Sequence, residues 1–84
     1  MDYTRPEDLI NEIEMIDEWD RFLVMLAAGD ILSLHGWTGD ALEKAMLRVN
    51  KLRFKPPLST DNVSWIAWNI NNPGHIPVIA PILK

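Results

Sequence analysis

Serine and histidine are the residue types in this protein that could support nucleophilic catalysis. None of the three serines lies in a G-x-S-x-G elbow, the turn that exposes a nucleophile above a sheet. The two histidines, His35 and His75, lack the spacing of a zinc-binding pair, and each lies beside a glycine that indicates a turn. The sequence has no cysteine, which excludes thiol nucleophiles, iron–sulfur clusters and cysteine-based zinc sites. We therefore expect a non-catalytic protein with no cofactor and no metal.

Binding of phosphate groups is a second chemistry that the sequence could support. Basic side chains recur at steps of four, three and four residues, which places them on one face of a helix: Lys44, Arg48, Lys51 and Lys55. A short helix at residues 30–35, a glycine-containing turn and a helix from residue 39 have the layout of a helix-turn-helix. Against this, Asp40 and Glu43 lie where bases would be read, and the net charge of the whole protein is -4. Nucleic-acid binding by the basic helix 39–54 is therefore the alternative function.

Charge is sorted along the sequence. Residues 1–20 hold eight acidic side chains and a single arginine, whereas residues 41–55 hold five basic side chains and one acidic. One interpretation is that the acidic segment packs beside the basic helix, where exposed ion pairs contribute only ~0–1 kcal/mol each. The other is that an acidic face, formed by Glu7, Glu14 and Glu18, steers a basic partner toward the protein.

Four tryptophans and an apolar C-terminal segment exceed what so small a core needs. Trp19 lies on a helical stripe and is expected in the core, whereas Trp37 lies in a glycine-flanked turn. Either residues 76–83 cover the apolar surface that remains, or a partner does, because surface patches of this kind usually mark protein interfaces. The predicted contact residues are Trp37, Trp65, Trp68, Ile79 and Ile82.

Two apolar stripes run through the first part of the sequence. Thr4 and Glu7 form a capping-box pattern, so a helix is expected to begin there. One stripe is Leu9, Ile13 and Ile16, and the second is Met15, Trp19, Phe22 and Leu26, roughly 110° away. Either the helix breaks within residues 17–20 or one long helix contacts two neighbours. We expect Gly29 to end the helix that carries the second stripe. A short helical turn that ends at Gly36 is expected to follow.

The clearest helical pattern covers residues 39–54. Its stripe is Leu42, Ala45, Met46, Val49 and Leu52, and the two prolines at 56 and 57 end it. The caps at residues 59–61 favour a helix over 61–70, although a strand is the alternative. Residues 72–75 predict a type II turn, and the two prolines in residues 76–83 predict an extended segment.

These patterns predict one all-α domain over residues 1–84, a bundle of three or four helices with an extended proline-containing C-terminal segment. The alternative is α+β with a hairpin at 63–83. No apolar run approaches the ~20 residues of a membrane span, and the first residues lack a signal-peptide pattern, so we expect a cytoplasmic protein without a membrane partner. The expected function is a protein-interaction module: an adaptor, an inhibitor or a self-assembling subunit that binds a protein or a second copy of itself. Its size and composition are typical of a bacterial or phage accessory protein.

Overall fold

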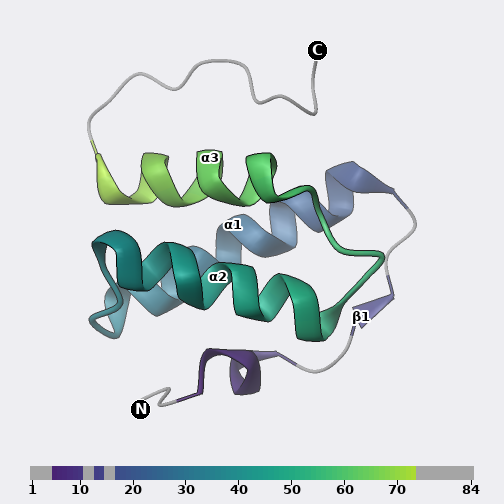
Figure 1. The fold of residues 1–84 in the computed structure, drawn as a ribbon, viewed down its shortest axis with the longest axis horizontal. Coiled ribbons are helices and arrows are strands. Elements are labelled where there is room, and N and C mark those ends of the chain that lie inside the picture. Colours follow the sequence, from purple (N-terminus) through teal and green to yellow (C-terminus); the bar gives the residue numbers. More distant parts are fainter. Residues whose placement is uncertain (1–4, 11–12, 15–16, 74–84) are drawn as a thin grey trace.

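A computed structural model describes residues 5–10, 13–14 and 17–73 of the protein. Its elements in sequence order are the 3-10 helix η1 (Pro6–Leu9), strand β1 (Ile13–Glu14), α1 (Glu18–Leu34), α2 (Gly39–Arg53), strand β2 (Phe54–Lys55) and α3 (Thr60–Asn71). Helix α2 lies between α3 and η1, and α1 packs behind both α2 and α3 (Figure 1). Strands β1 and β2 form a two-residue parallel pairing. The prediction of a small, mainly helical bundle is confirmed.

The N-terminal segment differs from the expected helix. Only the single turn of η1 forms, and the backbone is extended again at Ile10. Arg5, at the N-cap position, makes no side-chain cap hydrogen bond, and Glu7 turns toward α2 to bind Arg48. A long-range ion pair therefore replaces the local cap that the capping-box pattern predicts, and Thr4 itself lies outside the described residues.

Helix α1 begins within the predicted break and continues past the predicted stop. Asp17 caps it, its carboxylate accepting a hydrogen bond from the Asp20 backbone N–H at 2.9 Å. The expectation that Gly29 ends the helix is wrong, so no separate short helix forms at 30–35. A Cβ atom at Gly29 would lie 2.5 Å from Ile70 Cδ1 and 2.9 Å from Met46 Cε, so the glycine allows close packing of the three helices. Gly36, at φ 97°, makes the turn that follows the helix.

Helix α2 has the predicted bounds to within one residue. Its buried stripe contains Leu42, Ala45, Met46 and Val49, but the last expected member, Leu52, is exposed because it lies toward the outer side of the bundle. Asn50 is buried, and its amide group makes two hydrogen bonds to the backbone of Leu58, at 2.8 and 2.9 Å. That pair holds the proline-containing connection against the end of α2.

Helix α3 confirms the helical interpretation over the hairpin. Ser59 is its N-cap, with Oγ accepting a hydrogen bond from the Asn62 backbone N–H at 3.2 Å. At its other end, Asn71 exchanges hydrogen bonds with the backbone N–H and C=O of Gly39, at 2.8 and 3.1 Å, and so joins the end of α3 to the start of α2. The predicted turn at 72–75 extends beyond the described residues, and the segment 76–83 lies outside them.

The core is built from all three helices and from the connection before α3. Its fully or nearly buried apolar side chains include Phe22, Met25, Leu32, Leu42, Met46, Val49, Phe54, Leu58, Val63 and Ile66. Leu9 and Ile10 pack against it from the N-terminal segment. The core is therefore one continuous unit.

The Asn50 side chain is the buried polar group on which the α2–α3 connection depends. Replacing it in Asn50→Ala leaves the N–H and C=O of Leu58 without these partners, so the free energy of unfolding should fall by about 2–4 kcal/mol. Urea denaturation followed by circular dichroism measures this. Asn72→Ala, which removes an exposed hydrogen bond within one helix end, is the control and should change stability by less than about 0.5 kcal/mol. Equal losses in the two variants would contradict the assigned role of Asn50.

Candidate protein-binding surface

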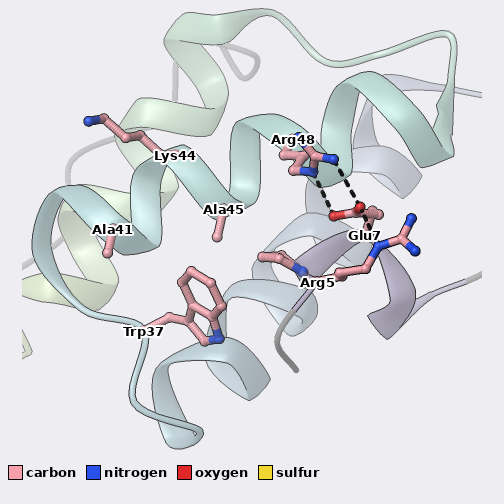
Figure 2. Close-up of a pocket in the computed structure, with 8 residues that line it drawn as sticks. Arg5, Glu7, Trp37, Ala41, Lys44, Ala45 and Arg48 are labelled. Atoms are coloured by element: carbon pink, nitrogen blue, oxygen red, sulfur yellow. Dashed lines mark hydrogen bonds and ion pairs between the residues drawn. The ribbon is translucent and has the colours of Figure 1, made fainter. Parts of the chain in front are cut away.

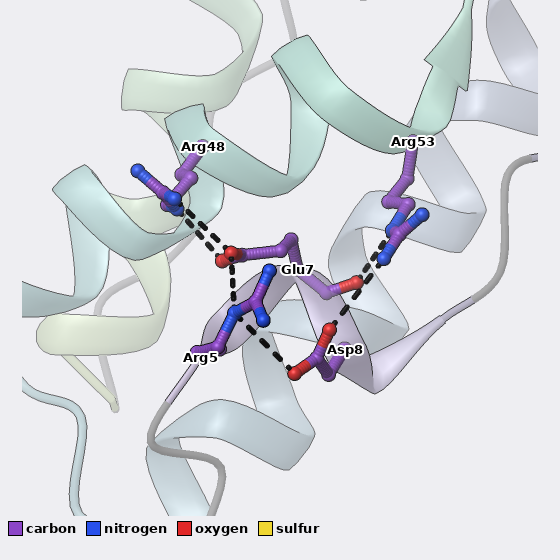
Figure 3. A network of polar contacts seen from close by, with 5 residues as sticks. All are labelled: Arg5, Glu7, Asp8, Arg48 and Arg53. Atoms are coloured by element: carbon purple, nitrogen blue, oxygen red, sulfur yellow. Dashed lines mark hydrogen bonds and ion pairs between the residues drawn. The ribbon is translucent and has the colours of Figure 1, made fainter.

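The carboxylate of Glu7 is the centre of a charged network that fastens η1 to α2. Its Oε1 accepts a 2.7 Å hydrogen bond from Arg48 Nε, and its Oε2 accepts 3.1 Å bonds from Arg48 Nη2 and Arg5 Nε (Figure 3). Arg53 donates a 2.7 Å bond to the Glu7 backbone carbonyl and forms a 3.5 Å ion pair with Asp8. The Glu7 side chain is only 2% exposed. A buried carboxylate is tolerated there because two guanidinium groups meet it.

This arrangement supports the first interpretation of the sorted charge for Glu7 and Asp8. The acidic N-terminal segment and the basic helix pair within one molecule, at Glu7 with Arg48 and at Asp8 with Arg53. Glu7 is therefore not part of an exposed acidic face, contrary to its place in the predicted steering surface. Glu18 is exposed at the start of α1, and Glu14 lies in β1. The structure does not bring the three predicted acidic residues into one exposed patch.

The predicted basic face is also divided. Arg48 directs its guanidinium to Glu7, whereas Lys44 and Lys51 are exposed on α2. Lys55 lies in β2, because the helix ends at Arg53 and the four-residue repeat no longer applies beyond it. One continuous helical face with four available cations is therefore not present.

A hollow of about 420 Å³ lies between η1 and the first half of α2. Its lining is apolar at Pro6, Trp37, Ala41 and Ala45 and charged at Arg5, Glu7, Lys44 and Arg48. In Figure 2 the Ala45 side chain points toward the Trp37 ring, whereas the Lys44 ammonium points away from it. Trp37, predicted as a contact residue from its position in a glycine-flanked turn, is half-buried beside Ala45. Its ring is part of this hollow and is also packed against the core.

Trp19 of α1 and Trp65 of α3 form one aromatic row through Phe22. Trp19 stacks on Phe22 with ring centroids 5.6 Å apart and planes 6° apart, and Phe22 meets Trp65 at the same centroid distance. The expectation that Trp19 is a core residue is wrong: it is 44% exposed, since the buried Phe22 occupies the core position beside it. Of the predicted contact residues, Trp65 is half-buried and Trp68 exposed, whereas Ile79 and Ile82 lie outside the described residues.

The outer face of α1 carries an apolar stripe that the sequence pattern alone does not mark as surface. Its members recur at steps of four, four, four and three residues: Trp19, Leu23, Ala27, Ile31 and Leu34. The large side chains are 44% (Trp19), 45% (Leu23), 38% (Ile31) and 85% (Leu34) exposed. The buried face of α1, with Met25 and Leu32, lies roughly 180° around the helix. Helix α1 is therefore apolar on two opposite sides, of which the bundle covers one.

Acidic groups border this outer stripe. Asp17, Glu18 and Asp20 lie at its N-terminal end and Asp30 near its C-terminal end, and all four are exposed. The one basic residue of α1, Arg21, is buried at 7% exposure on the core side. The stripe and its border form what we call the α1 surface: apolar in the middle and negative at both ends.

The described residues contain no group of three or more acidic, histidine or cysteine side chains that could hold a metal ion. None of the described helices has both the length and the apolar character that a membrane span requires. In comparisons with known proteins, neither a family model, nor a curated protein, nor a solved structure matches this sequence or fold.

The network around Glu7 should be visible as a dependence of stability on pH. Hydrogen bonds from Arg48, assisted by a backbone hydrogen bond and by Arg5, lower the pKa of Glu7 from 4.5 to about 2. Because the folded protein binds this proton less tightly than the unfolded state does, the stabilisation is fully present above pH 4.5 and is lost as the pH falls toward 2. Glu7→Gln should lower the thermal midpoint at pH 7 and flatten its fall between pH 4.5 and 2.

The control for this measurement is Glu18→Gln, which removes an exposed carboxylate at the start of α1. It should keep the wild-type slope of thermal midpoint against pH. If Glu7→Gln kept that slope as well, the carboxylate of Glu7 would not be held by the arginines in solution.

Proposed function

We propose that this protein is a non-catalytic protein-binding module that uses the α1 surface as its contact face. The single observation that carries the proposal is the outward apolar stripe of Trp19, Leu23, Ile31 and Leu34. A helix that is apolar on two opposite sides is expected to be covered on both, and the described residues bury only the inner side of α1. An apolar patch of this kind on a small domain is typical of a protein interface.

The charge around the stripe indicates what kind of partner fits. Acidic groups lie at both of its ends, and the exposed part of α1 has no basic side chain to balance them. Two copies packed face to face through α1 would therefore bring like charges together, at a cost in binding free energy. A partner with an apolar strip bordered by lysine or arginine, such as a basic amphipathic helix, matches both features. The proposal thus favours a different protein over self-assembly.

The same features argue against the nucleic-acid alternative. Four of the six exposed large apolar side chains of the described residues lie on the acidic helix α1, where phosphate groups would be repelled. The basic residues of α2 are divided by the pairing of Arg48 with Glu7. Arg48 is exposed but already paired with Glu7, which leaves Lys44 and Lys51 as the exposed cations of α2 for which the described residues show no ion pair, fewer than small DNA-binding domains typically use for phosphate contacts.

A pair of charge-introducing variants tests the proposal. Leu23→Glu places a carboxylate in the middle of the α1 surface, whereas Leu52→Glu places one on α2 at a leucine of similar exposure. Both side chains are nearly half exposed, so each change should alter stability by less than about 1 kcal/mol. Leu23→Glu should abolish the stoichiometric, nuclease-resistant retention of a protein partner from host extract, and Leu52→Glu should retain it.

Two results would contradict the proposal. Retention of the same partner by both variants would show that the interface does not lie on α1. Recovery of nucleic acid that disappears with nuclease, in place of a protein, would support the basic helix instead. Sedimentation of the protein alone completes the test. If the wild type is a homodimer and Leu23→Glu dissociates it, the α1 surface is the interface, but the partner is a second copy of the protein and not a different protein.

A further inference from the structure

The hollow between η1 and α2 is independent of the α1 surface, and its construction suits a small ligand. The α2 side presents Ala41 and Ala45 one turn apart, and these small side chains leave open the space that larger residues would fill. Trp37 supplies the facing wall (Figure 2), and Pro6 also lines the hollow. A volume of about 420 Å³ with mostly apolar walls lies in the range of small-molecule sites.

The charge of the lining is positive, although the whole protein is negative. Three cationic residues, Arg5, Lys44 and Arg48, line the hollow together with one carboxylate, Glu7, and Arg5 also forms a 3.6 Å ion pair with Asp8 outside the lining. Both oxygens of Glu7 already accept hydrogen bonds from the two arginines, so this carboxylate is neutralised in place. The Arg5 and Arg48 side chains are still 67% and 58% exposed, and each guanidinium carries more N–H donors than these contacts use. Lys44 adds a third cation, for which the described part of the protein shows no ion pair.

We propose that this hollow binds a small carboxylate with an apolar body, such as an arylalkanoic acid or the free C-terminus of a peptide that ends in an aromatic residue. The apolar body lies against Trp37, Ala41 and Ala45, and the carboxylate lies at the cationic edge. Guanidinium groups favour a carboxylate because their planar N–H pairs match its two oxygens. The apolar walls disfavour small hydrated anions, which would leave that surface uncovered.

Titration of the full-length protein with 3-phenylpropionate tests this site. The readout is the indole N–H signal of Trp37 in a ¹H–¹⁵N NMR spectrum, assigned by its loss in Trp37→Phe. The signal should shift saturably with a Kd on the order of 1 mM, which is typical for a ligand of this size. The uncharged 3-phenylpropionamide should bind about tenfold more weakly because it lacks the carboxylate.

Variants separate the site from general charge effects. Lys44→Met keeps the length of the side chain but removes its charge, and should weaken 3-phenylpropionate binding about threefold or more. Lys51→Met is the matched control, an exposed lysine of the same helix outside the hollow, and should leave the Kd unchanged. Ala41→Phe, which fills the hollow from an exposed position, should remove binding, whereas Ala27→Phe on α1 should not.

The source of the ligand is distinguished by a second pair of probes. If N-acetyl-Gly-Phe with a free carboxylate binds more tightly than 3-phenylpropionate, the site is assigned to the terminal carboxylate of a peptide, and weaker binding assigns it to a free acid. The proposal is overturned if the Trp37 signal does not shift, if the amide binds as well as the acid, or if Lys51→Met weakens binding as much as Lys44→Met.

Discussion

In the part of the protein that the structure describes, α2 is packed by α3, η1 and α1, whereas α1 is packed by α2 and α3 on one side only, and this difference governs the arrangement of the protein. Helix α1 is apolar on two opposite sides, and the bundle buries the side with Met25 and Leu32. Gly29 allows α1 to approach Ile70 and Met46 closely, so the buried side is packed tightly. The opposite side, with Leu23 and Ile31, is left in water. In our account this uncovered side serves binding, since burying such a side chain stabilises a complex by roughly 1.5–3 kcal/mol.

The charged network around Glu7 holds the N-terminal segment against α2, whereas apolar packing holds the three helices together. A four-residue 3-10 turn has little stability of its own, because it contains few internal hydrogen bonds. Arg48 and Arg53 reach it from α2, and their bonds to the carboxylate and the backbone carbonyl of Glu7 hold it in place. As a result η1 lines the hollow together with Trp37, and Arg5 and Arg48 lie at its edge.

Much of the fold could be predicted from local patterns, whereas the site depends on long-range contacts. The stripe of α2 from Leu42 to Val49, the Ser59 cap of α3 and the Gly36 turn are local signals, and each is found as predicted. The rule that a glycine ends a helix misplaces the end of α1 at Gly29. This glycine instead makes room for the side chains of Ile70 and Met46, which come from two other helices. Glu7 could not be assigned because its partner lies 41 residues away. The outer stripe of α1 is visible as a repeat of four residues, but periodicity alone does not tell which of two apolar sides faces the core.

The central claim is that the outer side of α1 is a binding face for a basic, apolar partner. The most direct measurement is ¹H–¹⁵N NMR of the protein with a helical peptide that has a leucine face bordered by lysines, and with a second peptide in which glutamates replace the lysines. The account predicts shifts confined to the exposed residues of α1 with the lysine peptide, weaker at high salt, and none with the glutamate peptide. Shifts centred on α2, or equal shifts with both peptides, would contradict it.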